Sequence, residues 1–273
     1  MRIVSLKGTS LSTSRLGFGT SGLHRILRSR RRQDLLAAAF DSGFRHFDTS
    51  PFYGHGIAEC ELGQFARGRR SELLIATKFG IKANPLLARF PWLMYARLAL
   101  NAAQRRITRK NRLAITPARD HSPGEARASL ERSLRALRTD HVDIYFLHEP
   151  VNAQLRAGDE LPTMLDRLRR EGKARYIGLA GAARDCIEVV KRFPGMAQIM
   201  QIDAAPGQEE LRLMREAGLA CHVSFGHFRD RNASMKSLLN TAFQHNQDGV
   251  VLYSTRHAMR VAETVALTSE LER

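Results

Sequence analysis

Eight short apolar or β-branched runs, separated by longer amphipathic stretches, restrict the fold of this chain more than any other feature. The runs lie at residues 15–20, 44–49, 73–78, 142–147, 174–180, 197–202, 219–225 and 249–254. Strands that alternate with helices build a parallel sheet, because each crossover returns the chain to the same end of the sheet. Eight such units in 273 residues predict one domain over residues 1–273, a (β/α)8 TIM barrel with a short strand or hairpin at its N-terminus.

The best-defined helix is predicted to follow Ser122. Apolar residues recur there at helical spacing, at Ala126, Leu130, Leu134 and Leu137. Because a glutamate stands three residues after the serine, the start has the pattern of a capping box.

Composition excludes several classes of protein. No apolar run approaches the roughly 18 residues of a membrane span, and the N-terminus lacks the apolar segment and cleavage site of a signal peptide. The three cysteines, Cys60, Cys186 and Cys221, are odd in number, far apart and form no CxxC. We therefore expect a cytoplasmic protein with reduced, packed thiols rather than disulfides or a zinc site.

The net charge of +16 is unusual. Such a charge invites a nucleic-acid or anionic-membrane interpretation. The arginines are spread over the chain without a nucleic-acid motif, so we expect no specific nucleic-acid partner. Basic residues are concentrated at residues 24–32 and at 73–119, and the second segment contains ten Lys or Arg and no Asp or Glu.

Residues 84–119 form a long basic insertion after the third predicted barrel strand. Past Pro91 the pattern predicts an amphipathic helix. Its apolar face would carry Trp92, Ala96, Leu100, Ala103 and Ile107, and its polar face Arg97, Asn101, Gln104 and Arg105. Our preferred hypothesis is a lid over the active site; docking on an anionic membrane surface or a protein partner, or a solvated insertion, are the alternatives.

A competing fold is suggested by GFGTSG at residues 17–22, which matches the dinucleotide-binding pattern G-x-G-x-x-G. That fingerprint opens a helix at once, whereas here the helical pattern begins near Arg32. The chain also contains no Tyr-x-x-x-Lys pair. The barrel remains the better prediction.

Four polar residues come at or just after predicted strands: Asp48, Tyr53, Lys78 and His148. The carboxyl ends of barrel strands open at one rim, so these side chains should converge. A phenol with a pKa near ~10 works as a proton donor and acceptor near neutrality only beside a cation, here Lys78. Asp48 would keep Lys78 charged, and His148 would orient a substrate carbonyl.

The chain resembles the aldo-keto reductase superfamily over nearly its whole length. The resemblance lies in LGFGT (16–20), GFRHFDTSPFYGHGIAECELGQF (43–65), LLIATKFG (73–80) and SLERSLRALRTDHVDIYFLHEP (129–150). It implies that Asp48, Tyr53, Lys78 and His148 are the catalytic tetrad. It also implies an NADP(H)-dependent oxidoreductase that reduces an aldehyde or ketone, or oxidises the corresponding alcohol or sugar, with Tyr53 as proton donor.

The resemblance further implies positions that bind NADP(H). Gln201 matches the glutamine that holds the nicotinamide carboxamide, while Ala180 and Gly181 replace the family's Ser-Asn pair. The tyrosine that stacks on the nicotinamide aligns with Ser224, so the neighbouring Phe225 would have to supply the aromatic ring.

The segment STRHAMRVAE (254–263) resembles the family's segment that binds the adenosine 2′-phosphate and adenine. The resemblance gives these binding roles to Thr255, Arg260 and Glu263. An arginine at this position favours NADP over NAD.

Two other functions remain open. A metal-dependent TIM-barrel hydrolase could draw its ligands from His46, Asp48, His55, Glu59 and His148. The ten histidines contain no His-x-His or His-x-x-x-His pair, so we expect no metal. The second alternative is a non-enzymatic, NADP(H)-binding regulatory member of the same fold. For an enzyme, we expect a small carbonyl or sugar-like substrate.

Overall fold

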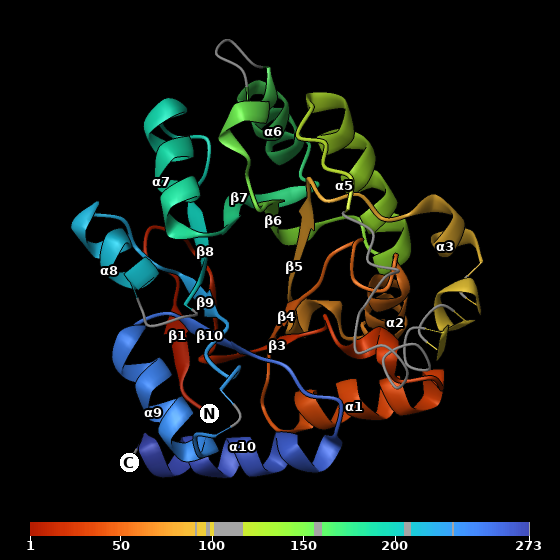
Figure 1. The fold of residues 1–273 in the computed structure, drawn as a ribbon, viewed down its shortest axis with the longest axis vertical. Coiled ribbons are helices and arrows are strands. Elements are labelled where there is room, and N and C mark those ends of the chain that lie inside the picture. Colours follow the sequence, from red (N-terminus) through yellow and green to blue (C-terminus); the bar gives the residue numbers. More distant parts are fainter. Residues whose placement is uncertain are drawn as a thin grey trace.

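The computed structural model describes residues 1–90, 92–96, 99–100, 117–155, 160–204, 209–230 and 232–272. Its centre is a closed barrel of eight parallel strands in the order β10-β3-β4-β5-β6-β7-β8-β9, surrounded by helices (Figure 1). The strands are β3 (Leu16–Gly19), β4 (His46–Asp48), β5 (Leu74–Phe79), β6 (Val142–His148), β7 (Ala174–Gly181), β8 (Ile199–Asp203), β9 (Val223–Phe225) and β10 (Val250–Tyr253). All eight predicted strands, and the predicted TIM barrel, are confirmed.

The expected N-terminal hairpin is also present. Strands β1 (Ile3–Ser5) and β2 (Ser12–Ser14) pair antiparallel, with Val4 opposite Thr13. Buried apolar residues of the hairpin region, including Leu6 and Leu11, belong to the same cluster as Leu74 at the start of β5 and the barrel interior. The hairpin therefore packs against the end of the barrel where the strands begin.

The helices form the outer layer, and a second apolar cluster fills the space between them and the strands. They are α1 (Ser29–Asp41), α2 (Ile57–Phe65), α3 (Pro85–Arg89), α5 (Pro123–Leu137), α6 (Leu161–Arg170), α7 (Ala183–Arg192), α8 (Glu209–Glu216), α9 (Met235–His245) and α10 (Ala258–Leu271). Short 3-10 turns η1 (Leu23–Arg25), η2 (Arg70–Glu72) and η3 (Asn152–Gln154) join some of them. Helix α1 begins at Ser29, three residues before the predicted start, so its first turn is strongly basic.

Helix α5 follows its sequence pattern closely. Its predicted apolar stripe is buried, and the Ser122 side chain accepts a hydrogen bond from the Glu125 N–H. The reciprocal bond of a capping box is replaced, because the Ser122 N–H donates to Asp120 and the Glu125 carboxylate pairs with Arg132. Arg132, two helical turns after Glu125, therefore takes the carboxylate that would otherwise bond to the Ser122 N–H.

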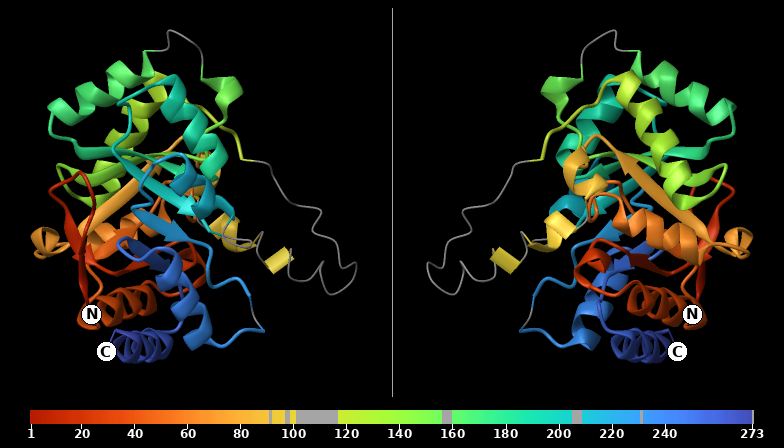
Figure 2. Two further views of the ribbon diagram at one scale, coloured as in Figure 1. Left: turned by 90° about the vertical axis from the view of Figure 1, so that its left-hand side faces the viewer. Right: turned by 90° about the vertical axis from the view of Figure 1, so that its right-hand side faces the viewer.

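The insertion after β5 is only partly described, since residues 91, 97–98 and 101–116 lie outside the described part. Helix α3 and the turns after it stand out from the barrel on one side (Figure 2). Trp92 and Leu100, on the predicted apolar face, are 64% and 62% exposed. The described part of that face is therefore turned to solvent.

The two ends of the chain lie close together (Figure 2), and the backbone N–H of Arg2 donates to the Glu272 carboxylate. No helix among the described residues has both the length and the apolar composition that a membrane span requires.

Gly63 allows α2 and α5 to pack closely. A Cβ at this position would lie 2.4 Å from the Ala136 carbonyl oxygen and 2.6 Å from the Leu137 Cα. Because both contacts are with backbone, no rotamer change relieves them. We predict that Gly63→Ala lowers the free energy of unfolding by about 1–3 kcal/mol. Urea unfolding would measure this as a lower midpoint with an unchanged m-value.

The matched control is Gly124→Ala in α5, where an added Cβ has no neighbour within 4 Å. This change should be neutral or stabilise by less than about 1 kcal/mol. Equal destabilisation by both changes would contradict close helix packing as the reason for Gly63.

Candidate functional site

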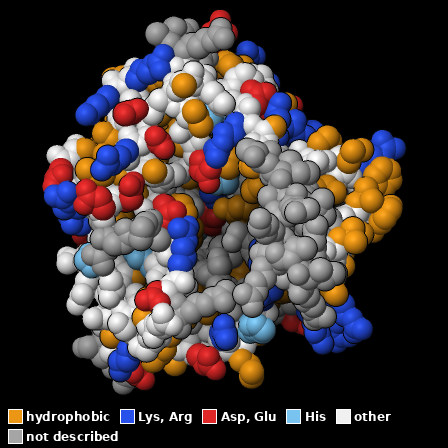
Figure 3. Space-filling view, in the orientation of Figure 1, with side chains coloured by type: hydrophobic (Ala, Val, Ile, Leu, Met, Phe, Trp, Pro, Cys, Tyr) orange, Lys and Arg blue, Asp and Glu red, His pale blue; other side chains and the backbone are white. Residues whose placement is uncertain are grey.

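Four predicted site residues line one cavity of about 430 Å³ at the carboxyl ends of the barrel strands. Asp48 ends β4, Lys78 lies near the end of β5 and His148 ends β6, while Tyr53 lies in the turn after β4. Figure 3 shows a hollow near the middle of the viewed face. The structure thus brings together the residues that the sequence placed at one rim.

Lys78 and Asp48 form a buried ion pair on the cavity floor. The Lys78 Nζ lies 2.5 Å from Asp48 Oδ2 and also donates to the Thr49 carbonyl oxygen at 3.0 Å. Burial raises the pKa of Asp48 and lowers that of Lys78, and their mutual attraction opposes both shifts. The close contact holds the two groups together as an ion pair.

The turn after β4 holds Tyr53 at the cavity. Gly54, His55 and Gly56 all adopt positive φ, at 63°, 52° and 97°. A Cβ on Gly54 would lie 2.3 Å from the Cβ of His24, so glycine is required by both space and conformation. Consecutive left-handed residues are uncommon and persist where the surrounding structure fixes them.

Tyr53, Lys78 and His148 surround the same point. The Tyr53 and His148 rings lie 6.1 Å apart at 87°, and the Lys78 Nζ lies 5.3 Å from the Tyr53 ring centroid. Burial, followed by the charges of Asp48 and Glu149, raises the pKa of Tyr53 well above its ordinary value.

This direction is opposite to the lowering expected from Lys78, because burial and the charges of Asp48 and Glu149 favour the protonated phenol. Tyr53 is a protonated phenol at neutral pH.

His148 is a neutral imidazole. Burial lowers its pKa well below the usual value, and the charge of Lys78 adds to this shift. Its Nδ1 is buried without a hydrogen-bond partner in the described residues. A neutral imidazole can donate one hydrogen bond to an oxygen in the cavity without placing a second cation beside Lys78.

Two predicted cofactor residues line the cavity and a third does not. Gln201 and Phe225 are lining residues, and the Gln201 Oε1 is buried without a hydrogen-bond partner among the described residues. Ser224 is buried on the other face of β9, where its hydroxyl bonds to His227 and Asn246. Because neighbouring strand residues point to opposite faces, Phe225 reaches the cavity and Ser224 cannot. The prediction of Ser224 as a cofactor contact is therefore corrected.

Ala180 lies beside His148 in the β6–β7 register and lines the cavity. The position next to it, Gly181, packs against Glu149, since a Cβ there would lie 3.3 Å from the Glu149 Cα. Glu149 has a left-handed backbone with φ 46° and forms an ion pair with Arg119 at 2.5 Å. Small residues on β7 thus leave room for the turn that follows His148.

The three remaining predicted cofactor residues lie outside this cavity. Arg260 and Glu263 are exposed on the first turns of α10, and Thr255 precedes that helix. The Thr255 hydroxyl accepts a hydrogen bond from the His257 N–H. Thr255, Arg260 and Glu263 thus lie within one short segment around the start of α10. None of them lines the cavity that contains the four candidate catalytic residues.

The metal alternative has no geometric support. Among the described residues, no group of three His, Cys, Asp or Glu side chains could hold a metal ion. His46 is buried inside the barrel, where burial and the charge of Lys78 lower its pKa to about 3. Glu59 instead accepts a hydrogen bond from the Thr77 hydroxyl at 2.6 Å, and burial raises its pKa to about 7. These candidate ligands are therefore separate, internally packed groups.

Sequence reasoning missed several lining residues, among them Phe52, Phe228 and Arg229. Arg229 forms an ion pair with Asp203 at 2.9 Å, and the Phe228 ring packs edge-on against Tyr253. Each of these residues lies within four positions of the carboxyl end of a strand. This position in the sequence was the signal that could have predicted them as lining residues.

The predicted lid is not observed in the described part of residues 84–119. None of those residues lines the cavity. The described insertion is attached at its base, where the Asn84 N–H donates to His55 Nδ1.

Comparisons with known proteins identify the family of this chain and similar folds. The model of the aldo/keto reductase family matches residues 15–206. The chain is 26% identical over 196 residues to a D-threo-aldose 1-dehydrogenase from a Pseudomonas species, covering 70% of this chain and 56% of that protein. It is 27% identical over 236 residues to an NADH-specific methylglyoxal reductase of Escherichia coli, covering 82% and 66%. The chain spans about half the length of curated relatives such as the Pseudomonas enzyme.

A solved aldo-keto reductase structure from Bacillus halodurans, in its holo form, superposes with a TM-score of 0.74. The two chains are 19% identical, and the match covers 98% of this chain and 91% of the other. At 19% identity, this structural match shows a shared fold and nothing more. Since the family model itself extends over most of the barrel, the chain belongs to the aldo/keto reductase family.

Proposed function

We propose that this protein is an NADP(H)-dependent oxidoreductase that reduces an aldehyde or ketone, or oxidises the corresponding alcohol or sugar. The observation that carries this proposal is the cavity that Tyr53 shares with the Lys78–Asp48 ion pair and His148. A protonated phenol, a nearby buried cation and a neutral imidazole are the groups that carbonyl reduction requires at one oxygen atom.

Tyr53 donates its proton to the carbonyl oxygen. A nicotinamide cofactor held in the cavity would supply the hydride. The phenolate that develops on Tyr53 is stabilised by Lys78, which Asp48 holds in place at 2.5 Å. His148 donates a hydrogen bond to the same substrate oxygen and orients it toward the phenol. The raised pKa of Tyr53 means that the phenol carries its proton in the resting site.

The cavity offers two groups to the nicotinamide. The Gln201 Oε1, which has no hydrogen-bond partner within the described ranges, is an acceptor for the carboxamide N–H₂, and leaving it buried and unpaired would be costly. Phe225 provides the aromatic surface that Ser224, on the opposite strand face, does not. With Ala180 in place of a polar residue, the carboxamide is held mainly by Gln201.

NADP is the preferred cofactor because Arg260 stands at the start of α10 with Thr255 and Glu263 near it. An exposed guanidinium and a helix N-terminus both favour a phosphate. One relative is described as NADH-specific, so this preference depends on Arg260 in this chain.

The substrate we propose is a small carbonyl or sugar-like compound. The similar proteins act on an aldose and on methylglyoxal according to their names. The cavity of about 430 Å³ has both aromatic and charged walls, from Phe52 and Phe228 to Glu149 and Arg229. Such walls suit a compact, polyhydroxylated molecule.

A non-enzymatic, NADP(H)-binding member is the second candidate, and the loss of the Ser-Asn pair at Ala180 and Gly181 favours it. The two candidates differ in one measurement: oxidation of NADPH by the protein in the presence of a reactive small aldehyde. Turnover supports the enzyme, and tight NADPH binding without turnover supports the regulatory member.

We predict that Tyr53→Phe lowers kcat for any accepted carbonyl by roughly 10² to 10⁴, because the variant keeps the ring and loses the proton. NADPH binding should remain nearly unchanged, as measured by fluorescence titration. Tyr176→Phe is the matched control, since that hydroxyl bonds to Ser10 at the far end of β7. Near-normal kcat in Tyr53→Phe would show that another group donates the proton.

Lys78→Met should lower kcat by a similar factor, because the cation stabilises the developing phenolate. The double variant with Tyr53→Phe should be little slower than either single variant, since the two residues act as a unit. Thermal unfolding would be recorded alongside, because the change leaves Asp48 buried without its partner. Fully additive losses of kcat would contradict the coupling.

We predict that Arg260→Ala weakens NADPH binding by about 1.5–3 kcal/mol and leaves NADH binding nearly unchanged. Arg184→Ala, an exposed arginine on α7, is the matched control. Equal weakening of both cofactors, or of neither, would place Arg260 outside the 2′-phosphate site.

A further inference from the structure

A second concave surface lies between the start of α1 and the start of α10. This α1–α10 groove has a volume of about 700 Å³ and shares no lining residue with the Tyr53 cavity. Its cations are Arg25, Arg28, Arg31 and Arg256, and its single lining acid is Asp34. Arg260 follows Ala258 by two residues, about 200° around the helix, so it points away from the groove that Ala258 lines.

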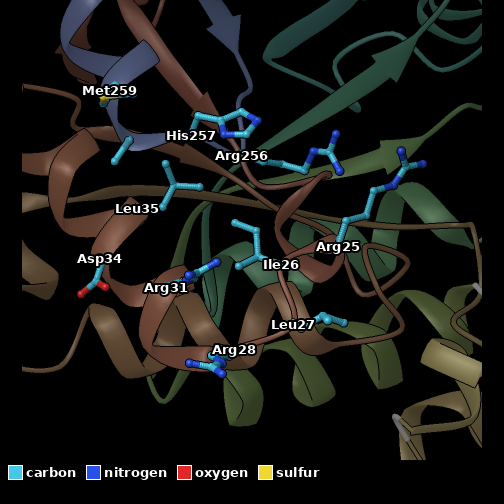
Figure 4. A pocket seen from close by; sticks show the side chains of 11 residues that line it. Arg25, Ile26, Leu27, Arg28, Arg31, Asp34, Leu35, Arg256, His257 and Met259 are labelled. Atoms are coloured by element: carbon cyan, nitrogen blue, oxygen red, sulfur yellow. The ribbon is translucent and has the colours of Figure 1, made fainter. Parts of the chain in front are cut away.

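The guanidinium groups of the groove form no ion pair within the described part of the chain. None of the four donates a side-chain hydrogen bond or forms an ion pair with the residues that the structure describes. Figure 4 shows Arg25 and Arg256 close to each other on one side of Ile26, and Arg28 and Arg31 on the other. Unscreened like charges repel, so the groove favours an anion with more than one negative group.

The helix ends add to this potential. Helices α1 and α10 both begin at the groove, and neither has an acidic residue in its first turn or a side-chain cap. Stability favours acids at helix N-termini, where the macrodipole is positive. Arginines at the start of α1 are therefore unfavourable for the fold alone, which indicates that they bind something outside it.

The rim of the groove is apolar and exposed. Leu27 and Met259 line it with exposures of 72% and 79%. The Arg32 Nη2 donates both to the Leu27 carbonyl oxygen at 3.1 Å and to the hydroxyl of Tyr95, the residue three positions after Trp92. Trp92 is itself 64% exposed. Arg32 is anchored by Glu61 at 2.8 Å, so the arrangement is fixed from the core.

We propose that the α1–α10 groove and its apolar rim dock on an anionic phospholipid surface. The arginines bind headgroup phosphates, and Leu27, Met259 and Trp92 enter the interfacial layer, the combination by which basic amphipathic surfaces bind anionic membranes. A small soluble phosphate would use the arginines and leave the exposed apolar rim without a role. The net charge of +16 attracts the whole chain to the same surface.

The first test is co-sedimentation of the full chain with phosphatidylglycerol–phosphatidylcholine vesicles and with vesicles of phosphatidylcholine alone. Binding should require the anionic lipid and weaken as salt shortens the Debye length. Arg28→Ser/Arg31→Ser should weaken binding by roughly 25-fold, about five-fold per arginine. Leu27→Ser/Met259→Ser should remove the binding that remains at high salt.

Two control variants separate the groove from net charge and general hydrophobicity. Arg184→Ser/Arg215→Ser removes the same charge from exposed positions on α7 and α8, and Ile3→Ser removes an apolar residue that is 57% exposed on β1. Both should bind as the parent does, and circular dichroism should be unchanged in all variants. Equal weakening by the α7 and α8 changes would overturn the proposal in favour of non-specific attraction.

Trp92 supplies an internal probe, because it is the single tryptophan of the chain. Its emission should shift to the blue with phosphatidylglycerol vesicles and be quenched by brominated lipid, and both effects should be lost in Arg28→Ser/Arg31→Ser. The proposal fails if vesicles bind without changing Trp92 emission. It also fails if inorganic pyrophosphate or a protein binds the groove arginines while anionic vesicles do not.

Discussion

The ion pair between Lys78 and Asp48 is the interaction on which the candidate site depends. Two charges buried at 1% and 3% side-chain exposure carry a large desolvation cost, which only close contact and further hydrogen bonds can offset. The contact requires β4 and β5 to be neighbours in the barrel, and the Thr49 carbonyl provides a further acceptor. Removing either partner leaves a buried charge, at a cost of about 3–5 kcal/mol. The pair therefore links the stability of the barrel to the position of the cation beside Tyr53.

Precision at Tyr53 comes from the backbone more than from side-chain contacts. The three left-handed residues 54–56 reverse the chain immediately after the tyrosine, and the close approach of His24 leaves no room for a Cβ at Gly54. The turn then leads directly into α2, which is packed against α5 at Gly63. A chain of rigid packing thus connects the outer helix layer to the phenol. Since a proton donor must meet its acceptor within hydrogen-bond reach, this rigidity is a requirement of the proposed chemistry.

Much of the fold and of the cavity could be predicted from the sequence because both depend on local patterns. Strand periodicity located all eight barrel strands, and the rule that strand ends meet at one rim brought Asp48, Lys78 and His148 together. Three features could not be predicted in this way. A shift of one residue along β9 decides whether Ser224 or Phe225 reaches the cavity. The pKa of Tyr53 depends on burial and on the charges of Asp48 and Glu149, which only the fold brings near it. Amphipathic periodicity in residues 84–119 predicts an apolar face but not what that face contacts.

The two basic regions of the molecule differ in how their charges are balanced. At the cavity, Arg119 and Arg229 are paired with Glu149 and Asp203, and Lys78 is paired with Asp48. These pairs leave little net charge at the mouth, so binding there depends on directed hydrogen bonds, as a neutral carbonyl substrate requires. In the α1–α10 groove the arginines have no such partners among the described residues, and two helix N-termini add positive potential. The groove therefore carries positive charge that is not paired in the way the charges at the cavity are, which separates attraction to an anionic surface from recognition of the substrate.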